Sequence, residues 1–354
     1  MFIIRNATLE DVPALLRMAK TVHSNNLPAD ERELTQVVER SLASFAGDTV
    51  LDDRFFTFVL IDESTGDIAG TSAIIARRGT PARPRLYLKV RRHQHYSQDL
   101  QAGQMQTTVQ LMQDTDGVTE VGGLVLAPAY RGSGQRLGSF LSRARFSFMG
   151  LHPEWFMNRI VAEVMGVLTP DGRTKLWDHL GRRFINLSYQ EADTFSLTSK
   201  EFITSLFPEG EIYISLMPAE ARNLIGAVSP DAVPALRMLE RLGFEQVDEV
   251  DPFDGGPYLT ARRDSIPLVA STAMVELTGH ADCEGTTGFI SLRKEDEFRC
   301  IRSAYELTGG RLTLPAAAAE ALQAQRGDSV GFTPVPGSSG SKNAPSAGSD
   351  SVAT

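Results

Sequence analysis

The chain has 354 residues, of which 42% are hydrophobic and 22% are charged, as in an ordinary globular protein of roughly two domains. Its 44 acidic residues outnumber the 35 basic ones and give a net charge of −9, which argues against a general nucleic-acid binder. Cys283 and Cys300 offer neither a disulfide framework nor the spacing of a metal site. No signal peptide or membrane-spanning apolar run is visible, so we expect a cytoplasmic protein with no membrane partner.

The first 75 residues alternate between apolar runs and helical spacing. Val12, Leu15, Leu16 and Met18 recur at the interval of a helix face, with Thr8 or Asp11 available as the cap. We therefore expect a strand at 1–4, helices from residue 12 and at 31–45, and strands at 55–61 and 68–75 joined by a hairpin turn.

Residues 79–104 are rich in arginine, histidine and tyrosine, with strand character only at 86–90. His93 and His95 lie two apart, so they share a face if the segment is a strand. Two interpretations stay open: a solvated basic loop, or one lip of a ligand cleft.

The stretch from 119 to 149 combines a strand, a glycine-rich turn and a helix. An apolar run at 121–126 is followed by Tyr130-Arg131-Gly132-Ser133-Gly134, and an amphipathic helix begins near Leu137. Glycines let an anion approach the backbone, and exposed N–H groups converge at the positive end of the helix. The pattern favours an anion site, although a basic turn that binds nothing has the same composition.

The second half of the chain predicts further alternation and then a change of character. We expect a strand at 160–167, helices at 177–180, 199–206, 218–225 and 231–242, the last ending at Gly243, and a strand at 258–261. Residues 265–335 indicate a small β-rich annex with one helix at 316–324. The Ser-, Gly- and Ala-rich tail at 336–354 is predicted to be disordered. The predicted domains are thus 1–150, 151–264 and 265–335.

The spacing Pro-x-Tyr-Arg-Gly-x-Gly after a strand resembles the pyrophosphate loop of the GNAT superfamily, the acyl-CoA-dependent N-acyltransferases. The predicted order before the loop (one strand, two helices, three strands) is also that of GNAT proteins. The resemblance implies that Arg131, Gly132, Ser133 and Gly134 bind the pyrophosphate of coenzyme A.

Further stretches, in their shared order, resemble the arginine N-succinyltransferase family. They include Leu27-Pro28-Ala29, His95-Tyr96-Ser97, Val161-Ala162-Glu163-x-x-Gly166-Val167 and Phe253-Asp254-Gly255-Gly256-Pro257. The resemblance implies an α/β (α+β) fold: a GNAT-like core, a second related α/β half and the annex. It also implies succinyl transfer from succinyl-CoA, a co-substrate and not a permanently bound cofactor, to the α-amine of L-arginine. Leu124, with Val125 and Leu126, falls where the family binds succinyl-CoA.

The chain departs from the family pattern at two places. A His-Pro dipeptide, whose histidine the family uses as proton donor, is here Ser229-Pro230. A serine hydroxyl can relay a proton but does not titrate near neutrality as histidine does. The glycine loop is also slightly longer than the family norm.

Acyl transfer to an amine needs a proton acceptor, and three residues are candidates for catalysis. Glu120 begins the strand before the loop and shares a face with Leu124 by period two, unless it is a solvated strand-entry residue. His95 matches a family histidine. Ser229 is either a relay or simply the cap of the next helix.

Two carboxylates are candidates for contacting a cationic substrate. Glu163 lies in an apolar strand, where a carboxylate needs a cation; this is either the substrate or a neighbour such as Arg182 or Arg183. Asp254 precedes two glycines and serves equally well as a turn residue.

Other functions remain open. The protein could use another acyl-CoA or another amine such as ornithine, or it could bind coenzyme A or an amino acid without turnover. A homo-oligomer and a hetero-oligomer are equally compatible with the sequence.

Overall fold

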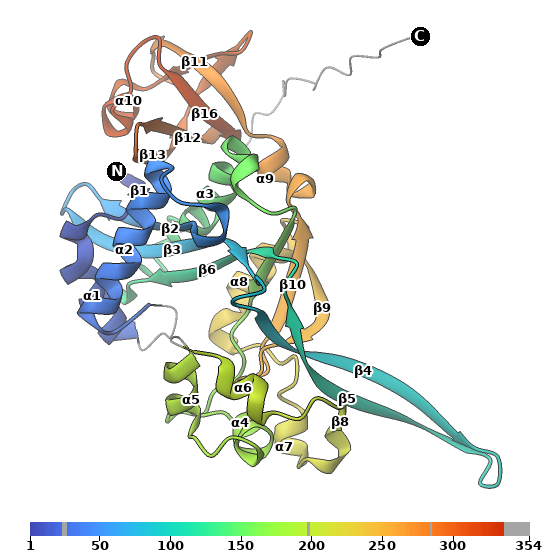
Figure 1. Cartoon of the computed structure of the whole chain (residues 1–354). Helices are drawn as coiled ribbons and strands as arrows, with labels where there is room; N and C mark the ends of the chain where they lie inside the picture. The colour runs from blue at the N-terminus through green and yellow to red at the C-terminus, as the bar shows by residue number, and fades with distance from the viewer. Residues whose placement is uncertain (23–26, 197–198, 284, 336–354) are drawn as a thin grey trace. The chain divides into compact units, whose positions relative to one another are not determined.

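The chain folds as two compact units, each assembled from separate stretches of sequence (Figure 1). The computed structural model describes residues 1–22, 27–196, 199–283 and 285–335. The first unit contains residues 1–74, 123–156 and those from 267 onward, and the second contains 75–122 and 157–266. The mixed α/β class is confirmed. The predicted domain boundaries stay predictions, and the predicted disordered tail lies outside the described residues.

Strands and helices of the first unit come from both ends of the chain. Its elements are β1 (Phe2–Asn6), α1 (Val12–Val22), α2 (Glu31–Ala46), β2 (Phe55–Asp62), α3 (Leu137–Leu151), α9 (Pro267–Ala270), β11 (Ala273–His280), β12 (Thr287–Lys294), β13 (Glu297–Ala304), β14 (Glu306–Thr308), β15 (Arg311–Leu314), α10 (Ala316–Leu322) and β16 (Ser329–Pro334). Two more strands, β3 (Asp67–Arg78) and β6 (Val118–Leu126), run from this unit into the second.

The helix α2 shows how closely local sequence sets this unit's elements. Asp30 caps it by accepting a hydrogen bond from the Glu33 amide at 3.0 Å, and Gly47 ends it with a φ of 85°. Buried Leu34, Val38 and Phe45 lie on one face, as their helical spacing predicts.

The annex extends the sheet of the first unit and does not stand apart from it. β1 pairs antiparallel with β2 on one side and with β13 on the other. The strands beyond follow the order β13, β12, β16, β11, β15, β14. The one helix predicted for this part is α10, whose residues Ala318, Ala321 and Leu322 pack against strand residues such as Ile290.

The second unit carries a sheet and a group of short helices. Its elements are β4 (Arg85–Ser97), β5 (Ala102–Asp114), β7 (Arg159–Glu163), α4 (Lys175–His179), α5 (Tyr189–Ser196), α6 (Glu201–Leu206), β8 (Ile212–Tyr213), α7 (Ala219–Arg222), α8 (Val233–Glu240), β9 (Glu245–Val250) and β10 (Pro257–Arg262). Its strand order is β6, β7, β10, β9, β4, β5, β8, with β6 and β7 parallel. The helices α4, α5, α6 and α7 share a core around Trp177, which stacks on Phe253 at 5.0 Å.

Strands β4 and β5 form a long hairpin that extends away from the other elements of its unit (Figure 1). They pair from Arg85 opposite Asp114 to Ser97 opposite Ala102. The sequence predicted strand character only at 86–90, because the outer part is polar on both faces and shows no alternation. The interpretation of this segment as a loop is therefore wrong, because it is a strand. Its outer part is exposed to solvent, as that interpretation expected.

Among the described residues, no helix is both long and apolar enough to cross a bilayer.

Aromatic rings form the centre of the first unit. Phe148 of α3 is fully buried, and its ring lies 5.0 to 5.4 Å from those of Phe45, Phe56, Phe58 and Phe298. The cluster joins α2, β2, α3 and β13, so one helix is fastened to strands from both ends of the sequence.

We expect Phe148→Ala to destabilise the protein by about 3–5 kcal/mol, because the substitution leaves a cavity among rings that cannot collapse. Urea unfolding followed by circular dichroism measures the change. Val50→Ala, at a position with 68% exposure, is the control and should stay within about 0.5 kcal/mol. Equal stability of the two variants would contradict this account of the core.

Candidate active site

The glycine-rich turn lies between β6 and α3, as the sequence predicts. Gly132 and Gly134 have φ angles of 69° and 75°, which favour glycine. A Cβ placed on either glycine would meet no atom within 4 Å, so this backbone is open. The Arg131 Nε donates to the carbonyl oxygen of Leu126 at 2.9 Å, which folds the turn back onto the end of the strand.

The N-terminus of α3 is available to an anion. No side chain caps this 15-residue helix, and its N-cap residue, Arg136, is exposed. Uncapped N–H groups at a helix start carry a partial positive charge. The turn therefore has the backbone of a phosphate site, with Arg131 and Arg136 adding positive charge.

Strand β6 is irregular before the turn. Gly123 has a φ of 59°, which departs from extended backbone. Val125 is buried in the core with α1 and α2, whereas Leu124 and Leu126 are half-buried. The prediction that Glu120 and Leu124 share a face assumed a regular strand, and the irregular backbone at Gly123 breaks that alternation.

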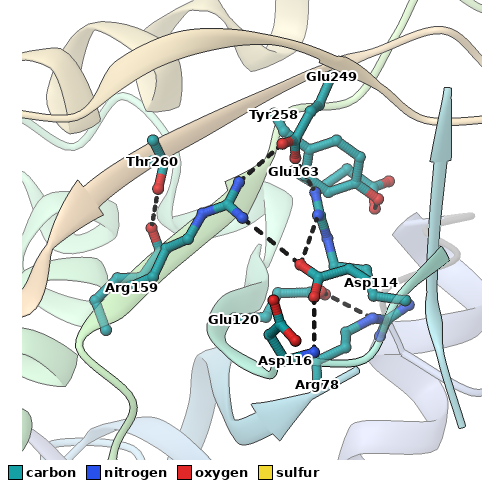
Figure 2. Close-up of polar contacts among 11 residues, drawn as sticks. Arg78, Asp114, Asp116, Glu120, Arg159, Glu163, Glu249, Tyr258 and Thr260 are labelled. Atoms are coloured by element: carbon teal, nitrogen blue, oxygen red, sulfur yellow. Dashed lines mark hydrogen bonds and ion pairs between the residues drawn. The ribbon is translucent and has the colours of Figure 1, made fainter. Parts of the chain in front are cut away.

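In the second unit, three neighbouring strands bring carboxylates together (Figure 2). Glu120 of β6 lies opposite Val161 of β7, and Glu163 of β7 lies opposite Tyr258 of β10. The strand residues 160–162 are buried, but the side chain of Glu163 reaches solvent.

The contacts of Glu163 include the nearby charge of Arg78 but no salt bridge with a described residue. Tyr258 donates its hydroxyl to Glu163 Oε2 at 2.9 Å, and Glu163 forms no salt bridge within the described parts of the chain. The predicted alternative of an internal pair with Arg182 or Arg183 is therefore wrong. Desolvation by the surrounding protein, with the nearby charges of Asp251 and Glu120, raises the pKa of Glu163 to about 8.

Asp251 and Asp254 hold a tight turn by their side chains. Asp254 accepts hydrogen bonds from the Gly166 and Gly256 amides at 2.8 and 2.7 Å, and Asp251 accepts from the Phe253 and Asp254 amides. Burial raises the pKa of both carboxyl groups above the ordinary aspartate value. Because both Asp254 oxygens are occupied, its predicted substrate contact stays a prediction and its observed contacts are those of a turn.

Two cations accompany these carboxyl groups. Arg78 lies 2.9 Å from Glu120, and this carboxylate raises the pKa of the guanidinium (Figure 2). Lys200 interacts electrostatically with Asp251, Glu120 and Glu163 but forms no salt bridge with a described residue. Burial first, and Arg78 second, lower the pKa of Lys200 to about 8. Nearby Asp193 has a pKa raised by burial.

A second polar network in the same unit is internally balanced. Arg85 and Arg159 both pair with Glu249, at 2.8 and 2.9 Å, and both approach Asp114, at 3.8 and 3.6 Å. The fully buried Arg85 guanidinium also lies 4.2 Å from the Tyr258 ring centroid. Two cations and two anions satisfy one another, so we assign this network to the structure of the sheet.

The two remaining catalytic candidates lie in different settings. The buried Ser229 donates its backbone N–H to the Met165 carbonyl oxygen at 2.9 Å, and its side chain makes no capping hydrogen bond. His95 is exposed on the hairpin, roughly 23 Å along β4 from Leu88, which pairs with Val250 beside the carboxylates. Within one chain His95 therefore does not join the acidic residues. The catalytic assignments of Glu120, His95 and Ser229 stay predictions.

Sequence reasoning missed Arg78, Lys200 and Tyr258 as members of this site. Arg78 ends an apolar strand together with Arg77, and this pair of cations is a usable signal. Tyr258 and Lys200 carry no such signal. Cross-strand register places Tyr258 opposite Glu163, and Lys200 lies at the start of α6, far from Glu163 in the sequence. Among the described residues, no group of three or more histidine, cysteine, aspartate or glutamate side chains could hold a metal ion.

Comparison with known proteins gives a consistent result along the chain. The family described as arginine N-succinyltransferase beta subunit matches residues 2–268, and its C-terminal domain matches residues 271–334. The arginine N-succinyltransferases of Escherichia coli O139:H28 and Shigella flexneri are 32% identical over 335 residues, covering 93% of this chain and 96% of each relative. The solved structure of arginine/ornithine succinyltransferase subunit AI from Pseudomonas aeruginosa superposes with a TM-score of 0.81 at 29% identity, covering 94% of this chain and 98% of that one.

The raised pKa of Glu163 predicts how stability depends on pH. Between about pH 4.5 and 8 the folded protein keeps a proton that the unfolded chain has lost, so stability falls as pH rises through this window. We expect the free energy of unfolding to fall less with pH in Glu163→Gln than in wild type, and Asp251 and Asp254 to cause the fall that remains. Urea unfolding at pH 5, 6.5 and 8 measures this free energy, with the exposed Glu240→Gln as control. Parallel pH profiles of wild type and Glu163→Gln would refute the assignment.

Proposed function

Because the chain belongs to the arginine N-succinyltransferase beta-subunit family, we propose that it transfers the succinyl group of succinyl-CoA to the α-amine of L-arginine. Succinyl-CoA is then a co-substrate that leaves as free coenzyme A. A cytoplasmic role in arginine breakdown is part of this proposal.

The reaction needs no redox partner. The neutral α-amine attacks the thioester carbonyl, a C–N bond forms, and the C–S bond breaks as the tetrahedral intermediate collapses. The proton lost by the amine is taken up by the thiolate or by solvent. The protein must therefore bind an anionic acyl donor, bind a cationic amino acid and accept or relay one proton.

The observation that carries the choice of a basic amino acid is the shortage of positive charge around Glu163. Among the described residues, the acidic cluster (Glu120, Glu163, Asp193, Asp251 and Asp254) interacts with Arg78 and Lys200, and a third cation, Arg85, is engaged by Glu249. Glu120 is already paired with Arg78, and the Asp251 and Asp254 carboxylates accept backbone amides. Glu163 is left solvent-accessible with one donor, and a guanidinium supplies the missing charge.

The acyl donor fits the first unit. Gly132 and Gly134 leave the backbone before α3 unobstructed, the helix is uncapped, and Arg131 and Arg136 are exposed. Pyrophosphate is the part of coenzyme A that such a helix start favours. Within the proposal, Ser229 relays a proton in place of the family's histidine.

The function is tested by the release of free thiol. Purified protein with succinyl-CoA and L-arginine should release one thiol per succinylarginine formed, identified by mass spectrometry. Acetyl-CoA and glutaryl-CoA, and L-ornithine and L-lysine, serve as competing donors and acceptors. No thiol release with any basic amino acid would reject the proposal, and a clear preference for another acyl-CoA or amine would correct its substrate.

The role of Glu163 is tested with Glu163→Gln, which removes the charge and keeps the shape. We expect kcat/KM for arginine to fall by about 10- to 150-fold, which is the usual effect of losing a hydrogen bond to a charged group. The KM for succinyl-CoA should stay unchanged. In wild type, binding of arginine should release a proton from Glu163, because the guanidinium lowers the pKa of that carboxyl group.

A neutral analogue provides the matched control. Citrulline has the shape of arginine without its charge, so wild type should discriminate strongly against it and Glu163→Gln should lose most of that discrimination. Calorimetry of arginine binding in two buffers of different ionisation enthalpy measures the proton release. Unchanged discrimination in the variant would remove Glu163 from the substrate site.

A further inference from the structure

One side chain of the C-terminal domain reaches the glycine-rich turn. Arg302, on β13, donates from a terminal guanidinium nitrogen to the carbonyl oxygen of Gln135 at 2.8 Å. The same guanidinium lies 5.6 Å from the ring centroid of Phe140, in the first turn of α3. Residues 167 positions apart are thus joined at the start of one helix.

The surrounding packing fixes this contact. Phe140 is 2% exposed, and its ring lies 5.3 Å from that of Phe289 on β12. Phe289 is directly opposite Arg302 in the β12–β13 pair. An aromatic contact therefore anchors α3 on the C-terminal domain, and Arg302 extends from the same place toward the turn.

The turn depends on outside support at this point. Arg136 has a φ of 53°, an uncommon conformation for a residue with a side chain, and no side chain caps the helix that follows. The hydrogen bond from Arg302 holds the carbonyl of the preceding residue, Gln135, and so helps to keep Arg136 in that conformation.

The charges around the turn are of one sign. Burial, and then the neighbouring Arg136, lower the pKa of Arg302, yet an arginine stays protonated in a protein. Arg302 forms no salt bridge with any residue that the structure describes. Two guanidinium groups thus repel each other beside the positive end of α3, and an anion placed there relieves that repulsion.

We propose that Arg302 of the C-terminal domain binds and positions the phosphates of the acyl donor, holding the turn through Gln135 and adding a third cation to Arg131 and Arg136. The inference rests on the proposed function for the identity of the donor. It gives the C-terminal domain a direct part in binding coenzyme A.

Arg302→Met tests it, because methionine keeps the packing on Phe140 and removes the charge. We expect the KM for succinyl-CoA to rise by about 10-fold or more, the weight of a charge-assisted hydrogen bond, with kcat and the KM for arginine within about twofold of wild type. Arg302→Lys should recover part of the loss. Arg311→Met, an exposed arginine on β15 of the same domain, is the control and should match wild type.

A donor without phosphates separates binding from general damage. Succinyl-pantetheine should be used equally well by wild type and Arg302→Met, because this donor has no phosphates for Arg302 to contact. A variant that loses activity equally with both donors, or one that keeps the wild-type KM for succinyl-CoA, overturns the proposal.

Calorimetry with coenzyme A alone keeps this test independent of succinyl transfer. Arg302→Met should bind coenzyme A about 10-fold more weakly than wild type, and raised salt should narrow the gap. Dephospho-coenzyme A identifies the group contacted: an unchanged gap indicates the pyrophosphate, and a vanished gap the 3′-phosphate. If coenzyme A binding depends on Arg302 but no succinyl group is transferred, the proposed reaction is rejected and this inference stands. If the succinyl group is transferred but binding does not depend on Arg302, the reaction stands and this inference is rejected.

Discussion

An excess of carboxyl groups over cations around Glu163 is the constraint on which the proposed chemistry of this protein depends. Placing carboxyl groups close together where the surrounding protein desolvates them is costly, and the cost appears as the raised pKa of Glu163, Asp251 and Asp254. Hydrogen bonds from backbone amides offset part of this cost for Asp251 and Asp254. Glu163 recovers little, since Tyr258 alone among the described residues donates to it. In the proposed function, the cationic substrate supplies the charge that Glu163 lacks.

The first unit presents the opposite requirement. Its turn before α3 gathers arginine side chains and an uncapped helix start around an open backbone, and this is completed by an anion. The proposed function assigns the phosphate-bearing donor to this turn and the cationic acceptor to Glu163. Strand β6 belongs to both units, with Glu120 near one end and the turn after the other.

The C-terminal domain is part of this arrangement and not an appendage. β13 pairs with β1, and Phe298 packs against Phe45, Phe58 and Phe148 in the core of the first unit. The same strand presents Arg302 to the turn. The physical effect is that the start of α3 is held from two sides, by its own strand through Arg131 and by the C-terminal domain through Arg302.

Local pattern alone determined much of the protein: the helix at Glu31–Ala46 and the glycine turn before Leu137 follow from short-range spacing, and the family resemblance implied the α/β class. The same pattern identified Glu163 as a carboxylate in a buried strand. Only the tertiary structure decided that Glu163 forms no salt bridge with a described residue, that Tyr258 lies opposite it, and that His95 lies far along a hairpin. It also brought Arg302 to a turn 167 residues away. The reason is that helix spacing and turn chemistry are properties of adjacent residues, whereas a charge balance depends on which distant residues the strand register brings together.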